Sequence, residues 1–249
     1  MHLRLFPSFG NCIVILTLAA CGAVLPSAIE AHESIPISGA IPDDEWERLD
    51  QFDGITIFQR KVPGSSLMAF KGEGVIRAPL DRVMSVIMDA PRRIEWMTRV
   101  RSAVVVKEPS KFERVEYVHM GTPWPLQDRD FIYHATLGTD GTGKVITFKA
   151  HSVEDATIPE VHGRVRAEVT FSDFLLKSTP EGETWVAAQV HVDPKGIIPA
   201  FIVNMVQRKF PRTSLAGLMR QVVKPDVTIH PLIADLLKPA AALQKAAIE

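Results

Sequence analysis

The sequence predicts an α+β fold in which a curved antiparallel sheet wraps around a long C-terminal helix. From Ala103 onward, apolar and polar residues alternate with a period of two for about ninety residues, as in half-buried strands. Turn-forming residues interrupt this region, and apolar residues then recur at helical spacing from about Gly196 to Val223. Helical patterns near the start and at the end of a strand-rich chain indicate the α+β class.

The elements follow in a definite order. Pro42 and the acidic residues after it open a short helix, because acids favour a helix N-terminus. Strand-like runs follow at 55–62 and 68–76, a helix starts at Pro79, and a second helical segment follows Pro91. Six strands then fit the alternation: 102–109, 112–121, 129–138, 144–153, 163–178 and 182–193. Glycine-containing turns at 138–141 and 180–182 predict that these strands form an antiparallel meander.

The last helix carries an apolar stripe that we expect to face the sheet. Its residues are Ile198, Phe201, Ile202, Met205, Leu215, Leu218, Met219 and Val222. Pro211 interrupts the stripe, and because proline removes a backbone hydrogen bond we expect a kink that acts as a hinge. A C-terminal extension, 225–249, is expected to form a short helix and a frayed end. It could pack on the domain or recruit a partner.

The N-terminus resembles an export signal. Residues 1–21 contain a short apolar core and end in Leu18-Ala19-Ala20-Cys21-Gly22, which resembles the bacterial lipoprotein box. We therefore expect an exported, periplasmic protein tethered to the outer membrane through lipidation of Cys21, with 22–42 as a flexible tether. The alternative is a plain secretory peptide that is cut a few residues later.

Composition and motifs exclude several classes of protein. With 46% hydrophobic and 23% charged residues, the chain is neither disordered nor a polytopic membrane protein. A net charge of -1 gives no support for nucleic-acid binding. Both cysteines lie near the N-terminus, which removes a thiolate zinc site and a cysteine nucleophile from the body. Residues 138–145 have phosphate-loop spacing, but Val145 stands where magnesium coordination needs Ser or Thr.

The histidines do not predict a metal site. Five of them fall in or near the predicted strands: His119, His134, His151, His162 and His191. None has another histidine two residues away, so solvated or hydrogen-bonded histidines are the preferred interpretation. We expect neither a metal nor another cofactor.

Two motifs carry a family resemblance. Residues 124–131 (Trp-Pro-Leu-Gln-Asp-Arg-Asp-Phe) and 193–204 (Asp-Pro-Lys-Gly-Ile-Ile-Pro-Ala-Phe-Ile-Val-Asn) together resemble the START family of lipid-transfer domains, over 43–224. The resemblance implies a helix-grip fold, as in START and Bet v1-like proteins, that encloses one lipid beneath the C-terminal helix without chemistry. It also implies a lipid ligand as partner, no catalytic residue, and a structural ion pair between Arg129 and Asp130. We expect a monomer.

The resemblance and the alternation together suggest lipid-binding residues. Counting back from Arg129, the acid that sterol-binding relatives place in the cavity falls on Glu116, and its basic partner falls on Ala135. A buried Glu116 would then need Arg114, Tyr133 or a water. The expected lipid-binding residues are Arg114, Glu116, Val118, Phe131, Tyr133, Ala135, Val169, Ala188, Val190, Ile198, Phe201, Ile202 and Met205.

Charge around the last helix suggests a membrane surface as a second partner. From Lys195 to Lys224 there are bases and no acid, which fits docking on anionic head groups through Lys195, Arg208, Lys209 and Arg212. A solvated helix face is the other interpretation. Two further functions stay open: a helix-grip enzyme, cyclase or hydrolase, using Glu116, His119, His134 or Tyr133 as acid or base, and a lipid sensor or assembly factor without transfer.

Overall fold

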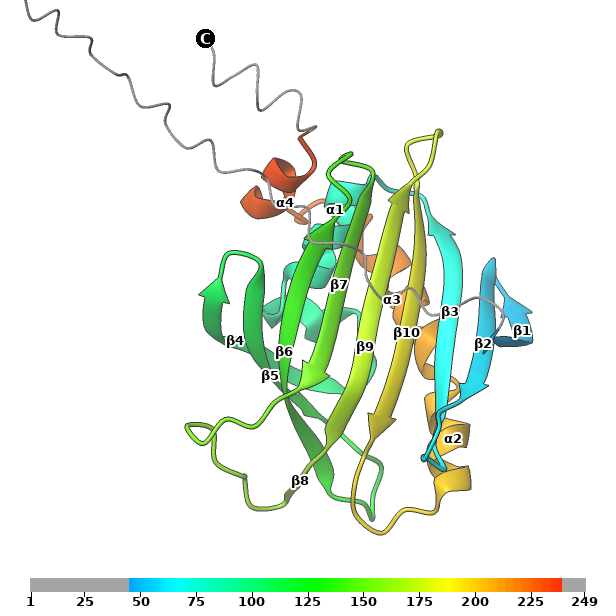
Figure 1. The fold of residues 1–249 in the computed structure, drawn as a ribbon, viewed down its shortest axis with the longest axis vertical. Helices are drawn as coiled ribbons and strands as arrows, with labels where there is room; N and C mark the ends of the chain where they lie inside the picture. Colours follow the sequence, from blue (N-terminus) through cyan, green and yellow to red (C-terminus); the bar gives the residue numbers. More distant parts are fainter. Residues whose placement is uncertain (1–44, 239–249) are drawn as a thin grey trace, which may run out of the picture. The chain divides into compact units, whose positions relative to one another are not determined.

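The computed structural model describes residues 45–238 and consists of one curved sheet with helices against its concave face (Figure 1). The strands are β1 (Glu47–Phe52), β2 (Ile55–Lys61), β3 (Met68–Ile76), β4 (Val100–Ser110), β5 (Glu113–Met120), β6 (Asp128–Thr139), β7 (Val145–Ser152), β8 (Arg164–Arg166), β9 (Glu168–Ser178) and β10 (Thr184–Asp193). The helices are α1 (Leu80–Met88), the 3-10 helix η2 (Pro91–Glu95), α2 (Ala200–Gln207), α3 (Phe210–Gln221) and α4 (Pro231–Leu236). The predicted signal peptide, its lipidation site Cys21 and the tether lie outside the described residues.

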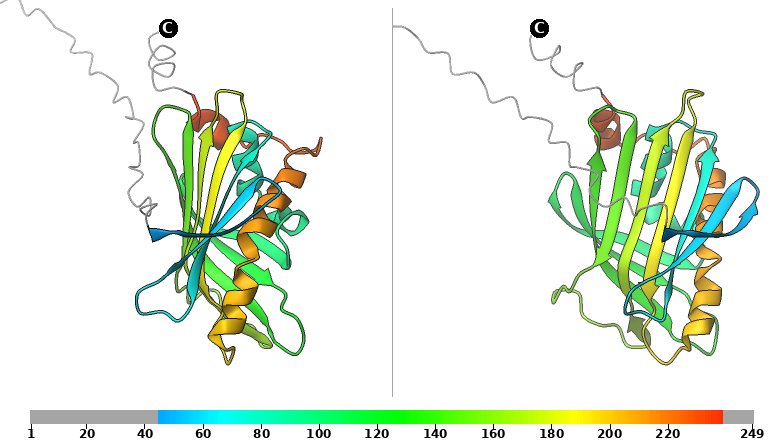
Figure 2. Two further views of the ribbon diagram at one scale, coloured as in Figure 1. Left: turned by 90° about the vertical axis from the view of Figure 1, so that its right-hand side faces the viewer. Right: turned by 45° about the vertical axis from the view of Figure 1, so that its right-hand side comes forward.

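The predicted curved antiparallel sheet with a helix against it is confirmed. Neighbouring strands follow the order β1-β2-β3-β10-β9-β7-β6-β5-β4, with β8 beside β6. β3 pairs with β10, from Ile76 opposite Thr184 to Phe70 opposite Val190, so the first strands adjoin the last one. Figure 2 shows that α2 and α3 run along the concave face of this sheet.

The single strand predicted at 163–178 is wrong, because two strands occupy this range. β8 pairs in parallel with the start of β6, and Arg166 lies opposite Asp130. β9 then pairs with β7 and β10 in antiparallel register. Ala167 lies between the two strands, and its N–H donates to the carbonyl of Asp130 (2.9 Å). The chain therefore changes its partner strand at Ala167, which alternation along one strand does not reveal.

The short helix predicted from Pro42 is also wrong in the described residues, because Glu47–Phe52 form strand β1. Asp53 and Gly54 both have positive φ (49° and 76°) and join Phe52 to Ile55 as a two-residue turn. Asp-Gly is a preferred sequence for such hairpin turns, since its residues tolerate positive φ. Pairing with β2 thus outweighs the acidic helix-start signal.

The last helix is broken where proline predicts it, but it begins later than expected. α2 ends at Gln207 and α3 begins at Phe210, with Pro211 in the first turn of α3, where a missing N–H costs little. The predicted start near Gly196 is wrong, because Lys195 and Gly196 have φ values of 52° and 78°. Residues in the left-handed region cannot continue a right-handed helix, so helical geometry begins at Ala200.

Helix α3 approaches the surrounding backbone closely at one glycine. A Cβ on Gly217 would lie 2.0 Å from the carbonyl oxygen of Trp96, directly after η2. Only glycine permits this contact, so α3 rests directly on the segment that carries η2. Leu215, Leu218 and Val222 of the predicted stripe are buried here, as expected.

The C-terminal extension packs on the domain in its described part. Ile233 and Leu236 of α4 belong to the same buried apolar cluster as residues of α1 and α3. The backbone N–H of His230 donates to Ser85 Oγ of α1 (2.8 Å) and fixes the start of α4. Within residues 45–238, no helix has the length and apolar character needed to cross a bilayer.

Candidate functional site

A cluster of charged side chains is buried on the concave face of the sheet. Glu116 of β5 has no exposed surface and contacts the guanidinium groups of Arg93 and Arg114. Arg93 Nη1 pairs with Oε2 and Nη2 lies 3.3 Å from Oε1, while Arg114 Nη2 lies 2.5 Å from Oε1. Tyr133 donates its hydroxyl to Oε2 (2.5 Å). We call these four residues the buried charge cluster.

The sheet register explains how three of these side chains meet. In the antiparallel β5–β6 pair, Glu116 lies opposite Tyr133 and Arg114 lies opposite Ala135. Directly opposite residues share a face, and residues two apart on one strand also share it. The predicted face of Glu116 is therefore correct. β6 offers no base opposite Arg114, because Ala135 is small and apolar.

Arg93 supplies the base that the sequence reasoning missed. It is 4% exposed and reaches the cluster from η2, where its Nη2 also donates to the carbonyl of Ile87 (3.1 Å). Its apolar neighbour Ile94 is instead exposed. One signal was available: Arg93 precedes the buried Trp96 by three residues, the spacing of one helix face.

Burial and charge shift the pKa values of this cluster in different directions. Burial alone would raise the pKa of Glu116, but the charges of Arg93 and Arg114 and the bonds that it accepts lower it overall. Burial lowers the pKa of Arg114, and it raises the pKa of Tyr133, which is therefore neutral at pH 7. With both guanidiniums charged against one carboxylate, the cluster carries one excess positive charge.

Arg114 is the less satisfied of the two arginines. Its Nη1 donates to the carbonyl of Met88 (2.7 Å), and its guanidinium lies over the ring of Phe148 at 5.3 Å. Its Nε is buried and has no hydrogen-bond partner among the described residues. Unpaired donors in a protein interior are costly, so Arg114 could accept a further anionic partner.

The surroundings of the buried charge cluster are apolar on both sides. A large apolar cluster fills the space beneath α1, α3 and α4, and a small one covers the region near the starts of β6 and β9. The small apolar cluster consists of Ala90, Val100, Ala103, Val118, Phe131, Ala167 and Val169. Tyr133 packs against both clusters, so the charged side chains lie at their junction.

Helix α2 is held to the sheet by few contacts. Asn204 accepts a bond from the N–H of Met68 (2.8 Å) and donates to the carbonyl of Ser66 (3.2 Å). Gln207 donates to the carbonyl of Val192 (2.7 Å), and Val203 is the buried side chain of this helix. The attachment of α2 is thus mainly polar.

The end of α3 is secured more firmly by an arginine of α1. The guanidinium of Arg82 donates to the carbonyls of Val222 (2.5 Å), Lys224 (2.6 Å) and Val227 (3.2 Å). These bonds satisfy carbonyl groups that lack partners at a helix C-terminus. The two halves of the broken helix therefore differ in how strongly they are attached.

Comparison with known proteins agrees with the fold and the two motifs. Residues 42–215, more than half of the chain, match the START domain family. The chain belongs to the START domain family. This confirms the resemblance carried by residues 124–131 and 193–204.

Relatives of this START domain are known from sequence and structure. An uncharacterized protein of Pseudomonas aeruginosa is 26% identical over 196 residues, covering 78% of this chain and 95% of that protein. The phosphatidylcholine transfer protein of Rattus norvegicus is 24% identical over 195 residues, which cover 77% of this chain and 88% of the rat protein. A solved STAR-related lipid transfer protein fragment from Xanthomonas axonopodis is 30% identical, with a TM-score of 0.65 over 73% of this chain and 100% of the fragment. Human StAR-related lipid transfer protein 5 shares the fold, with a TM-score of 0.68 at 18% identity over 72% of this chain and 87% of its own.

Most of the lipid-binding residues expected in this START domain lie inside it. Val118, Phe131 and Val169 belong to the small apolar cluster, and Ala135 and Ala188 belong to the large one. Val190 is buried, and Ile198 and Ile202 are half-buried.

The inward stripe is wrong at Phe201 and Met205, which are exposed. The predicted stripe assumed helical spacing from Ile198 onward, but helical geometry begins only at Ala200. The polar contacts of Asn204 and Gln207 then determine which face of α2 lies toward the sheet. In this orientation, the exposed side chains of Phe201 and Met205 do not support the predicted contact with a lipid in the interior.

The expected ion pair between Arg129 and Asp130 is wrong, because adjacent strand residues point to opposite faces. Asp130 instead pairs with Arg166 (2.8 Å) and accepts a bond from Tyr117 (2.8 Å). Arg129 donates to the carbonyls of Gln127 (2.5 Å), Pro194 (3.1 Å) and Lys195 (3.2 Å). It thereby joins the loop before β6 to the loop before α2.

The four bases expected to dock on membranes divide into two pairs. Lys195 pairs with Glu168 (2.7 Å) and Asp193 (2.9 Å), and Arg212 lies 3.3 Å over the ring of Phe52. Arg208 and Lys209 are exposed and form no ion pair within residues 45–238. The second pair is therefore the one available to an external anion.

The side chains considered as acids or bases of an enzyme contact other side chains of the protein. Glu116 and Tyr133 belong to the buried charge cluster, and His119 contacts Asp128 (2.8 Å). His134 lies edge-on to His151, with ring centroids 5.6 Å apart. In the described part of the chain, no three histidine, cysteine, aspartate or glutamate side chains gather as they would around a metal ion.

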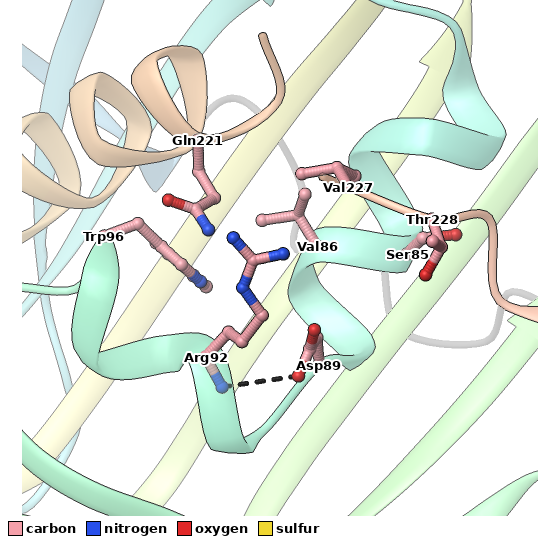
Figure 3. Close-up of a pocket in the computed structure, with 8 residues that line it drawn as sticks. All are labelled: Ser85, Val86, Asp89, Arg92, Trp96, Gln221, Val227 and Thr228. Carbon is pink, nitrogen blue, oxygen red and sulfur yellow. Dashed lines mark hydrogen bonds between the residues drawn. The ribbon is translucent and has the colours of Figure 1, made fainter. Parts of the chain in front are cut away.

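A cleft beside the end of α3 is too small for a lipid. Figure 3 shows its lining side chains: Ser85, Val86, Asp89, Arg92, Trp96, Gln221, Val227 and Thr228. Its volume of about 10 Å³ corresponds to about one water molecule. Trp96 Nε1 and Gln221 Oε1 are buried without a hydrogen-bond partner among the described residues.

Proposed function

We propose that this protein binds one lipid molecule beneath its C-terminal helix and transfers it between membranes, without catalysis. Membership of the START domain family supports a lipid-binding role in general, and one of its relatives is a phosphatidylcholine transfer protein. The observation that carries the proposal is the buried charge cluster within an otherwise apolar interior. Ligand sites of this kind combine apolar walls with a few polar groups that orient the ligand.

The excess positive charge of the cluster favours a lipid with an anionic group in its head. A phosphate or carboxylate near Arg114 Nε would pair with the donor that has no partner and would neutralise the excess charge. A neutral sterol hydroxyl would leave that charge uncompensated. We therefore expect a phospholipid or another lipid acid as cargo.

The attachment of α2 supports a gate at this helix. A lipid bound beneath the C-terminal helix would have to pass α2, which lies along the concave face of the sheet (Figure 2). Three hydrogen bonds and one buried side chain hold α2, whereas Arg82 secures the far end of α3. The break at Arg208 and Lys209 separates the two and would serve as the hinge. The predicted export and the Cys21 anchor would place this carrier in the periplasm.

The lipid can be identified by native mass spectrometry of the full chain purified from cells. We expect one bound lipid with an anionic head group, and an occupancy that falls about tenfold in Arg114→Leu, because a charge-assisted bond is lost. Arg77→Leu is a matched control, since Arg77 lies directly after β3 and is 92% exposed. A protein that stays empty after exposure to several lipid extracts would contradict the proposal.

The gate can be tested at Asn204. Asn204→Ala removes two of the three hydrogen bonds of α2, so we expect lipid exchange between vesicles and protein to become about tenfold faster. Exchange is measured with a fluorescent phospholipid. Val206→Ala, an exposed position on the same helix, should leave the rate unchanged. An unchanged rate in Asn204→Ala would exclude α2 as the gate.

A further inference from the structure

Two histidines face each other on the convex side of the sheet. His134 of β6 lies directly opposite His151 of β7, and their ring centroids are 5.6 Å apart. Tyr133 and Ala135, on either side of His134, point into the interior, so His134 itself points to the opposite face. That face lies away from the helices and toward the viewer in Figure 1. We call His134 and His151 the histidine pair.

The separation of the two rings fits two ligands of one metal ion. Zinc lies about 2.0–2.1 Å from an imidazole nitrogen, which places the centroid of each ring about 3.2 Å from the ion. Around a tetrahedral ion, the centroids of two such rings are then about 5.2 Å apart. The observed separation of 5.6 Å is close to this value, and a small rotation of either side chain accounts for the difference.

Both imidazole rings are available to an ion from solution. His151 is exposed, and the side chain of His134 is 22% exposed. His134 Nε2 lies 3.7 Å from Glu113 Oε1, which is too far for a hydrogen bond. The nearest ring to each histidine is that of the other, in an edge-on contact that leaves ring nitrogens free to bind a ligand.

The charges around the histidine pair favour a cation. The carboxylate of Glu113 lies beside His134, within reach of a water molecule bound to the ion. Carboxylates commonly take this position next to metal-binding histidines. Lys149 is the base two residues before His151 on the same face, but it lies opposite Asp173 of β9, whose negative charge offsets it.

We propose that the histidine pair binds one zinc ion, with water molecules as its remaining ligands. Neutral imidazole suits zinc, and the sheet register brings together two rings that are far apart in the sequence. Two protein ligands are fewer than the four of a structural zinc site, so we expect weaker, reversible binding. The sequence expectation of no metal considered histidines two residues apart on one strand, whereas this pair forms across two strands.

Zinc titration of the full chain, purified without metal, tests the site. Isothermal titration should show that His134→Ala and His151→Ala each weaken the zinc affinity at least about tenfold, because one of two protein ligands is lost. His162→Ala is the matched control, since His162 is an exposed histidine in the loop before β8. This control should bind zinc as the wild type does, and circular dichroism verifies that all variants fold.

Urea unfolding links the bound ion to the folded sheet. An ion that binds the folded protein more tightly than the unfolded chain raises the unfolding midpoint. Zinc should therefore raise the midpoint of the wild type and of His162→Ala, and leave that of His134→Ala and His151→Ala unchanged. Zinc held by the two cysteines near the N-terminus would act on all of these proteins alike.

The inference can fail separately from the proposed function. Equal zinc affinity in the wild type and both histidine-pair variants would overturn it, as would an equal rise of all the unfolding midpoints. The histidine pair faces away from the interior, so both variants should retain as much co-purified lipid as the wild type. A wild-type protein that binds zinc at this pair but never holds a lipid would contradict the proposed function alone.

Discussion

Glu116→Ala is expected to destabilise the protein by about 3–5 kcal/mol, because it leaves two buried guanidinium groups without their carboxylate. Arg93 and Arg114 both contact this side chain, which has no exposed surface. Urea unfolding followed by circular dichroism measures the loss. Glu113→Ala on the same strand is the control, since Glu113 is 39% exposed and should change stability by less than about 0.5 kcal/mol.

The pH dependence of stability distinguishes the charge of Glu116 from its packing. The pKa of Glu116 lies below its ordinary value of 4.5 in the folded protein, so its stabilising contribution is complete above that value. The contribution is lost as the pH falls through the folded pKa. The wild type should therefore approach Glu116→Ala in stability as the pH falls below 4.5 and through the lowered pKa of Glu116 in the folded protein. A difference that stays constant on acidification would show that the effect comes from packing alone.

The double variant Ile233→Ala/Leu236→Ala is expected to cost about 4 kcal/mol or more, because both side chains are buried in the large apolar cluster. This makes α4 an integral part of the domain, although the family match ends at residue 215. Thermal and urea unfolding measure the loss. Asp235→Ala, exposed on the same helix, is the control.

Two results would contradict this role of α4. Unfolding of the double variant at the wild-type midpoint would mean that α4 detaches without affecting the rest. An early, separate transition in the wild type would mean that α4 unfolds independently of the sheet.

Local patterns were sufficient for much of the fold. Alternation identified the strands because one face of each is buried, and it assigned Glu116 and Tyr133 to the same face. Pro211 predicted the helix break because proline lacks a backbone N–H, which is a local property of that residue. The change of partner strand at Ala167 depends on a distant segment, so the alternation did not show it.

The errors at the candidate site have two physical causes. Arg93 was missed because its partner lies on a different element, and only tertiary packing brings η2 over Glu116. Phe201 and Met205 were placed inside because the stripe was counted from Ile198, which lies before the first helical residue, Ala200.

The contact at Gly217 links the stability of the fold to the electrostatics of its interior. The glycine lets α3 rest on the carbonyl of Trp96, directly after the short helix from which Arg93 reaches Glu116. Any side chain at this position would push that short helix away from α3 and would shift the guanidinium relative to the carboxylate. Under the proposed function, a side chain at residue 217 would therefore change the affinity for the lipid as well as the stability of the fold.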